Sequence, residues 1–420
     1  MESSAIPIKR RKLDGNYDEL SREELLETIH RLENVVEHLK NSKNKDLTGK
    51  VEDPKRKIDF SKYKKRRVAF KILYLGWDYD GFVVQDNTDN TIEYHLFQAL
   101  IKGCLIEDRS SSNYHRCGRT DQGVSSFSQV ISLTVRSRLT DEAPNSEELP
   151  YCRILNGLLP NDIRVLAWAS VADNFSARFS CKMRTYKYWF PRGDLKIEKM
   201  DEAVKSVIGL HDFRNLCKMD VANGVVDFHR RIHDAAVTSV SKNGILHQAE
   251  FDMCELTITG EAFLWHQIRA IISVLFLVGQ EKESPEIFEK LLDINDCPRK
   301  PQYNLSSPLP LNLFSCKFDD VSWIIDQESL SKVISSLQSH WTSSAVKCCM
   351  LENFLKQFQL SSSCSFPSNP YSVLFKDANS KSYKPLLSRP TSRSLEDRIS
   401  HFVTKGRLKL EPKKSLPKSD

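Results

Sequence analysis

The chain has 420 residues, of which 40% are hydrophobic, and its formal net charge is only +6. These values predict a soluble globular protein with one large core or two ordinary cores plus tails. The eleven cysteines are scattered without a C-x-x-C pair, which argues against a disulfide framework and a zinc site and indicates a reducing compartment.

Basic residues are clustered although the net charge is small. One cluster lies at 62–67, and others occur in the last forty residues. Clusters of this kind attract polyanions such as nucleic acids. The alternative is that they form solvated faces or disordered arms.

The N-terminal region carries a basic run at 7–12 with no apolar segment behind it. A signal peptide is therefore not expected. Such runs are typical of nuclear import, and we expect the protein in the nucleus, the cytoplasm or both compartments.

A helix is predicted next, because Ser21 and Glu24 form a capping box. Its apolar residues alternate at spacings of four and three, which is the seam of a coiled coil of about two heptads: Leu25, Ile29, Leu32, Val36 and Leu39. The helix either packs on its own protein or pairs with another helix. A lysine-rich linker follows at about 41–61.

The following segments alternate between strand-like and helix-like patterns, which predicts an α+β or α/β body. Strands are expected at 68–75, 130–135, 185–190 and 255–259, with a turn at Gly76. Helices are expected from Thr91, at 198–207, at 263–279, between Asp320 and about 360, and from an N-cap at Ser394 to Gly406. A Ser-, Pro- and Asn-rich linker occupies 361–370, and the chain ends in a basic tail.

The stretch 262–279 is apolar enough to raise the question of a membrane span. It contains His266, Gln267 and Arg269, so a buried core helix explains it better and no membrane partner is expected. A buried guanidinium such as that of Arg269 requires an acidic partner. On these residues alone, that partner could belong to a structural ion pair.

The segment Cys117–Val124 places Arg119 and Asp121 between two glycines, just ahead of a predicted strand. Glycines keep a loop free of side chains where a ligand would approach. We therefore interpret the segment as a loop that presents Asp121. The simpler interpretation is a turn whose aspartate caps its own backbone.

The segment 184–190 alternates cationic and aromatic residues in a strand pattern. Arg184, Tyr186 and Tyr188 are expected on one face of that strand. An aromatic surface beside a cation suits stacking on a nucleic acid base and contact with its phosphate. An edge strand with a charged face is the alternative.

These segments resemble, in order, the GRTD-x-GV, R-x-Y-x-Y and F-L-x-x-x-x-R motifs of the TruA family of tRNA pseudouridine synthases. Weaker resemblances support them, and together they cover about 68–320: Leu158–Ile163, Phe175–Ser180, Gly209–Asn215 and Ser307–Leu311. The resemblance implies an α+β, duplicated pseudouridine-synthase fold, with two similar sheet-plus-helix halves and a central basic active-site cleft. The implied division is 1–61 (arm, helix and linker), 62–180 (first half), 181–360 (second half with C-terminal helices) and 361–420 (linker, short helix and tail).

The resemblance also implies roles for four residues. Asp121 is the catalytic residue, which either attacks C1′ of the ribose or removes a sugar proton. Arg119 fills the place vacated by a flipped base, Tyr186 packs on the target uridine, and Arg269 forms an ion pair with Asp121. Expected substrate contacts are Gly118, Thr120, Arg184, Tyr188, Phe263, Leu264, Lys64, Lys65, Arg66 and Arg67.

The implied partner is tRNA, the implied assembly is a homodimer, and no metal or organic cofactor is expected. The segment Gly81–Gln85, the N-terminal helix and the segment Tyr383–Leu408 most resemble the eukaryotic branch that modifies positions 38 and 39 of the anticodon stem-loop. Gln122 and the pair Trp265-His266 depart from many relatives. We expect neither to touch the catalytic residues, so activity is retained, although site preference could differ.

Two alternatives remain. A tRNA-binding or folding protein on the same scaffold would work without turnover. An acid dyad like that of aspartic proteases would need a second Asp-Thr-Gly-type loop, which we do not find.

Overall fold

The computed structural model describes residues 58–139, 147–240, 251–361, 369–379 and 382–405. The predicted N-terminal basic run and helix, most of the linker at 41–61, and the basic C-terminal tail lie outside these residues. From Phe60 onward the chain is one compact unit.

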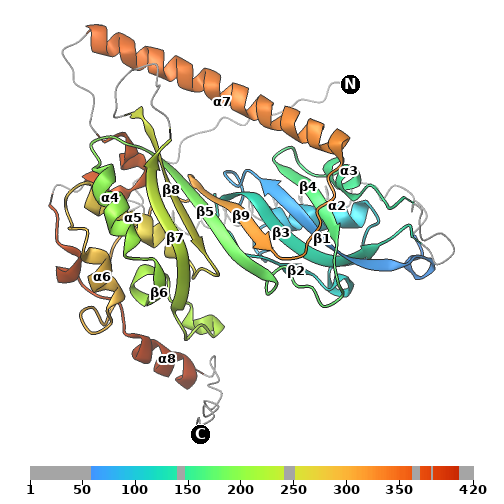
Figure 1. Cartoon of the computed structure of the whole chain (residues 1–420), viewed down its shortest axis with the longest axis horizontal. Helices are drawn as coiled ribbons and strands as arrows, with labels where there is room; N and C mark the ends of the chain where they lie inside the picture. Colours follow the sequence, from blue (N-terminus) through green and yellow to red (C-terminus); the bar gives the residue numbers. More distant parts are fainter. Residues whose placement is uncertain (1–57, 140–146, 241–250, 362–368, 380–381, 406–420) are drawn as a thin grey trace, which may run out of the picture. The chain divides into compact units, whose positions relative to one another are not determined.

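The strands of this unit form one continuous mixed sheet in the order β4-β1-β3-β9-β5-β8-β7-β6, with β2 paired to β3 (Figure 1). Their bounds are β1 Lys65–Tyr74, β2 His115–Arg116, β3 Ser125–Arg136, β4 Ile163–Ser170, β5 Cys181–Pro191, β6 Gly209–Asp212, β7 His229–Ser239, β8 Met253–Gly260 and β9 Leu311–Phe318. The helices are α2 Ile92–Lys102, α3 Tyr151–Asn156, α4 Ile197–Lys205, α5 Gln267–Gly279, α6 Ile287–Leu292, α7 Gln327–Ser361 and α8 Leu395–Thr404. The α+β class expected from the sequence is confirmed.

Two hydrophobic cores lie along this sheet. The first is built from β1, β3 and β4 with α2 and α3, and the second from β5 to β9 with α4, α5 and α6. We expected two joined halves, each with a small sheet backed by helices, and the sequence did not indicate how the two sheets are joined. β3 and β9 pair in parallel, Ser125 with Asn312 and Ser126 with Leu313, and join the two into one sheet.

Each core follows from local sequence signals. Thr91 caps α2 by accepting a hydrogen bond from the backbone N–H of Tyr94, and the helix buries Leu96 and Leu100 against the sheet. α5 is buried along almost its whole length, as expected for a core helix. Among the described helices, none is both long enough and apolar enough to cross a membrane.

α5 begins at Gln267 and not at residue 263 as the apolar pattern predicted. The preceding residue, His266, has φ = 60°, in the left-handed region. An α-helix cannot pass through such a residue. Residues 261–266 therefore form a loop between β8 and α5, and this loop reaches the candidate site.

Gly76, the predicted turn after β1, lies against the loop that carries Asp121. A Cβ atom at Gly76 would stand 2.0 Å from the carbonyl oxygen of Val124. Backbone atoms cannot move aside as a flexible side chain can. We therefore expect Gly76→Ala to destabilise the protein by about 1–3 kcal/mol or more in chemical denaturation.

The matched control for this prediction is Gly118→Ala in the same loop. A Cβ atom there meets nothing within 4 Å, so stability should change by less than about 0.5 kcal/mol. Equal stability of the two variants would contradict the steric argument.

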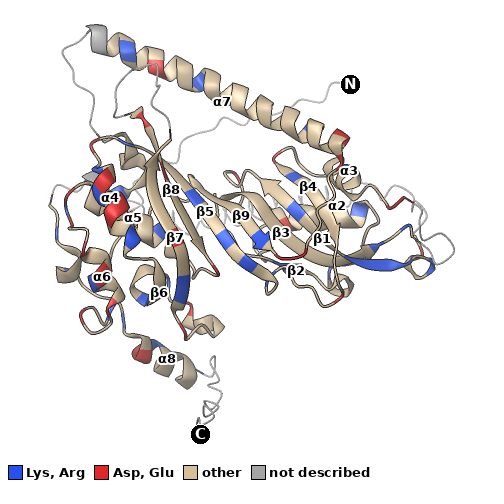
Figure 2. Ribbon diagram, in the orientation of Figure 1, with Lys and Arg blue, Asp and Glu red and all other residues tan. Residues whose placement is uncertain are grey.

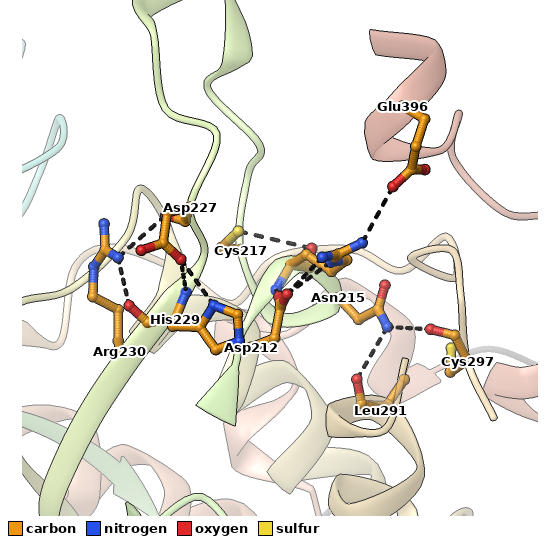
Figure 3. A network of polar contacts seen from close by, with 10 residues as sticks. Asp212, Asn215, Cys217, Asp227, His229, Arg230, Leu291, Cys297 and Glu396 are labelled. Atoms are coloured by element: carbon orange, nitrogen blue, oxygen red, sulfur yellow. Dashed lines mark hydrogen bonds and ion pairs between the residues drawn. The ribbon is translucent and has the colours of Figure 1, made fainter. Parts of the chain in front are cut away.

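The motif at Gly209–Asn215 has a structural role (Figure 3). Asp212 pairs with Arg214 at 2.7 Å, and Arg214 also approaches Glu396 of α8 at 3.7 Å. Asn215 donates to the carbonyl oxygens of Leu291 and Cys297 at 3.0 and 2.6 Å. The segment therefore ties α6 and α8 to the second core.

Candidate active site

The loop Cys117–Val124 connects β2 to β3, next to the junction of β3 with β9. Its turn is closed by a hydrogen bond from the N–H of Val124 to the carbonyl oxygen of Asp121, at 3.2 Å. Gly123 adopts φ = 79° in this turn, which suits glycine because it has no Cβ. The loop is therefore a fixed platform for the Asp121 side chain.

The carboxylate of Asp121 contacts three side chains from the start of α5 and the loop before it. The indole N–H of Trp265 donates to Oδ1 at 3.2 Å. His266 Nε2 lies 3.2 Å from Oδ2, and the guanidinium of Arg269 lies 3.7 Å from the same oxygen. The carboxylate thus points at the second half of the sheet and does not cap its own backbone.

These contacts decide the charge state of Asp121, whose side chain is 27% exposed. Burial by itself would raise its pKa, and this is the largest single effect. The hydrogen bond and charge of His266, the charge of Arg269 and the hydrogen bond from Trp265 together outweigh burial and hold the pKa below the usual value. Asp121 is therefore ionised at neutral pH.

Trp265 and His266 were not expected to touch the catalytic residues, and this expectation is wrong. The apolar pattern predicted a helix that begins at residue 263, and both residues would then lie inside that helix. The left-handed conformation of His266 turns them toward Asp121 instead. The one sequence feature that indicated these contacts was the presence of two aromatic residues with ring nitrogens, Trp265 and His266, shortly before Arg269.

Arg119 lies on the same loop and is exposed. Among the described residues, its guanidinium has no hydrogen bond or ion pair. It is therefore free to meet a ligand close to Asp121, as the base-flipping role requires.

Tyr186 shares one face of β5 with Arg184 and Tyr188, as its alternation predicted, and this face is buried. Its ring packs edge-to-face against Phe263, with the centroids 5.2 Å apart. Phe263 belongs to the loop that carries Trp265, so the expected base-stacking surface adjoins the expected catalytic acid. Leu264 in the same loop is buried.

Three residues that were predicted to contact substrate make contacts within the protein instead. Arg184 is buried and donates to the carbonyl oxygens of Cys117, Arg178 and Glu261. Tyr188 is fully buried in the core, and the Thr120 hydroxyl is 2.8 Å from that of Tyr74. These residues hold the site together and are not at its surface.

The basic residues at the start of β1 differ in how far they are buried. Lys64 and Lys65 are exposed, and Arg66 pairs with Glu148 at 2.8 Å. Arg67 is buried and donates to the carbonyl oxygens of Asn113 and Phe175 at 2.5 and 2.9 Å. The prediction that Arg67 contacts phosphate is therefore wrong, because Arg67 begins the buried part of β1 and its guanidinium is held by backbone carbonyl oxygens.

Three cysteines that are distant in the sequence meet below the catalytic loop. The sulfur atoms of Cys117, Cys181 and Cys316 all lie within 4.8 Å of one another and are buried. Spacing could not predict this cluster. Structural zinc sites take four ligands, and three sulfurs are one short of that number.

The site has one ionised acid at the junction of two sheet segments. Among the described residues no second carboxylate contacts Asp121, which excludes the acid dyad there. This arrangement defines the class of protein: a scaffold with a single ionised aspartate beside a cation and close to an aromatic residue.

Comparisons with known proteins agree with that class. A family model described as tRNA pseudouridine synthase matches residues 203–319. The human tRNA pseudouridine(38/39) synthase is 45% identical over 94% of this chain and 90% of its own length. The Saccharomyces cerevisiae protein of the same name is 39% identical over 74% of each chain. The tRNA pseudouridine synthase A of Methanosphaera stadtmanae is 32% identical over 66% of this chain and 93% of its own.

The chain therefore belongs to the TruA-type family of tRNA pseudouridine synthases.

Proposed function

We propose that this protein converts uridine to pseudouridine in the anticodon stem-loop of tRNA, at positions 38 and 39. The likeness to the human and yeast synthases over most of their length supports the position. The ionised Asp121 carboxylate, held between His266, Arg269 and Trp265, is the observation that carries the chemistry.

The reaction breaks the bond between N1 and C1′, rotates the base and bonds C5 to C1′. A uridine in a stem must first leave the helix, which costs about a few kcal/mol. Arg119, exposed and free beside Asp121, would fill the vacated place. Asp121 would act at the ribose, by attack on C1′ or by removal of a sugar proton.

The other residues have supporting roles. Tyr186 would pack on the extruded base, and Arg269 would orient and stabilise the Asp121 carboxylate. Lys64 and Lys65 would meet phosphates, with the salt dependence that such contacts carry. The basic cleft expected between the halves remains a prediction.

The test is purified protein with unmodified tRNA transcripts, with pseudouridine mapped by position. We expect product at positions 38 and 39 without added cofactor. Product confined to other sites would contradict the proposed position. Tight tRNA binding without product would favour the non-catalytic alternative.

We also propose that the protein forms a homodimer, and α7 supports this. The helix contacts α3 and β4 near its start and then runs beside few other elements (Figure 1). Its apolar residues recur at the alternating spacings of a heptad repeat. Several of them are exposed, including Ile334, Trp341 and Leu351, and Trp341 is 72% exposed. Such a heptad pattern is typical of a helix that pairs in a coiled coil. We expect the same helix of a second copy of this chain to pair with it.

Sedimentation tests this proposal. The chain should behave as a dimer, and the double variant Trp341→Glu, Leu351→Glu should be a monomer with unchanged circular dichroism, because two charges in the seam prevent pairing. Lys347→Glu, on the same helix, is the matched control and should remain dimeric. A monomeric wild type would contradict the proposal.

For location, we propose the nucleus, the cytoplasm or both compartments, on the basis of the basic run at 7–12. Imaging of a fluorescent fusion, with and without that run, tests this. Loss of the run should reduce the nuclear fraction.

A further inference from the structure

Lys and Arg residues occur along β5 of the sheet (Figure 2). The three donors around Asp121, however, come from α5 and the loop before it, and they are divided unequally between its two oxygens. Oδ2 is approached by His266 and Arg269, and Oδ1 by Trp265 alone. Both chemistries proposed for Asp121 need a free lone pair on a carboxylate oxygen within reach of the ribose. A carboxylate oxygen offers about two lone-pair positions, so Oδ2 keeps none beside its two donors, whereas Oδ1 keeps one beside the bond from Trp265 and is the oxygen with a lone pair left for the ribose.

Arg269 and His266 are poorly placed to withdraw. Their side chains are 14% and 15% exposed. Arg269 is on α5 and also donates through Nε to the carbonyl oxygen of Ser306 at 2.9 Å. His266 directly precedes the first residue of α5. Among the described residues, its ring has no polar partner except Asp121, because its Nδ1 is buried and unpaired.

Trp265 differs from both. Its side chain is 42% exposed and lies in the loop before the helix. One edge of the indole donates to Oδ1, and the ammonium group of Lys218 lies 3.8 Å from the ring centroid. The indole is therefore a donor to Oδ1 that is itself partly exposed to solvent.

We propose that Trp265 is a displaceable cap on Oδ1 of Asp121, and that His266 is a positioning residue that holds Oδ2. Oδ1 is then the oxygen that acts on the ribose. The inference rests on the proposed function, and it assigns a place in the reaction to two residues at variable positions of the F-L-x-x-x-x-R motif. Uridine entry turns the indole away, while His266 and Arg269 keep the carboxylate oriented and ionised.

The cap is tested with Trp265→Phe, which keeps an aromatic ring and loses the N–H donor. Because binding no longer has to break the hydrogen bond to Oδ1, KM should fall by about 3- to 10-fold while kcat stays the same or rises. A lower kcat, or a KM that is unchanged or higher, would overturn the cap. Trp323→Phe is the matched control, since Trp323 also pairs with a lysine, at 4.5 Å from Lys71, and should leave both constants unchanged.

His266 is tested with His266→Gly, because glycine adopts φ = 60° without strain, and with His266→Gln, whose amide can reach Oδ2. The glycine variant should lose about 10- to 100-fold in kcat, and glutamine should restore most of it. Wild-type kcat, or no rescue by glutamine, would overturn the positioning role.

The pH profile separates positioning from general damage. His266 and Arg269 are the titratable or charged groups in contact with Asp121, and Lys218 lies across the indole. Loss of His266 should raise the pKa of Asp121, so kcat/KM of the glycine variant should begin to fall at a higher pH than that of the wild type. Parallel profiles would overturn the role.

A second control is His229→Gln, which breaks a surface His–Asp pair of 2.8 Å (Figure 3) and should behave as wild type. The two failures remain distinguishable. An inactive wild type sinks the proposed function, whereas an active wild type with unaffected variants sinks only this inference.

Discussion

Replacement of Asp121 by asparagine should abolish pseudouridine formation, with a loss of at least about 10⁴-fold in single-turnover rate. Asparagine has nearly the same shape, and its amide oxygen can still accept the hydrogen bond from Trp265, whereas the NH2 group in place of Oδ2 cannot accept one from His266. It cannot carry the negative charge that either attack on C1′ or removal of a sugar proton requires. The rate of product formation on unmodified tRNA measures this loss.

Binding of tRNA to the asparagine variant should remain within about threefold, because phosphate contacts supply most of the affinity. A filter-binding or gel-shift titration at fixed salt provides that control. Equal product from variant and wild type would refute the assignment of Asp121.

The same variant makes a prediction about stability. The pKa of Asp121 is lowered in the folded state, so its ionised form stabilises the protein above the pKa of the unfolded chain. That contribution is lost as the pH falls through the folded pKa. The wild type should therefore be more stable than the variant near pH 7, with the gap closing toward pH 3, as denaturation at several pH values would show.

The second large effect is expected for Arg269→Met. Methionine keeps most of the apolar stem and removes the charge 3.7 Å from Asp121 and the hydrogen bond to Ser306. We expect kcat to fall about 100-fold, because the carboxylate loses orientation and electrostatic support. Stability should fall by about 1–3 kcal/mol, since a mostly buried acid loses its cation.

Two comparisons sharpen this prediction. Arg269→Lys keeps the charge but not the planar donor fork, so its kcat should lie between those of the methionine variant and the wild type. Arg153→Met removes an exposed arginine that pairs with Glu328 at 2.9 Å, and its stability should change by less than about 1 kcal/mol. Full activity of Arg269→Met would contradict the role.

Much of the fold could be predicted because its signals are local. The strand at 185–190 alternates along one segment, and Arg184, Tyr186 and Tyr188 share one face as expected, although that face is buried. Thr91 and Ser394 cap their helices through their own side chains. The pair Arg269–Asp121 was expected from the family resemblance and from the difficulty of burying a lone cation, and the structure places the two side chains together.

Other features depend on contacts between distant segments. The pairing of β3 with β9 joins residues almost two hundred positions apart, and no local pattern encodes such a partner. The burial of Arg67, and the meeting of Cys117, Cys181 and Cys316, depend on this long-range packing in the same way. The role of Arg184 as an anchor for the catalytic loop also needed the structure, because its partners are backbone carbonyls.

The proposed catalytic acid, its cation and the stacking tyrosine could be assigned from the sequence through the resemblance of three short motifs to those of the TruA family, whereas the residue patterns alone left structural roles open for all three. The tertiary structure alone decided what surrounds them. Trp265 and His266 reach Asp121 because one backbone angle at His266 ends the loop and starts α5. A single dihedral of this kind leaves no trace in hydrophobic periodicity, yet it sets the direction of two side chains and, through them, which oxygen of Asp121 is free to react.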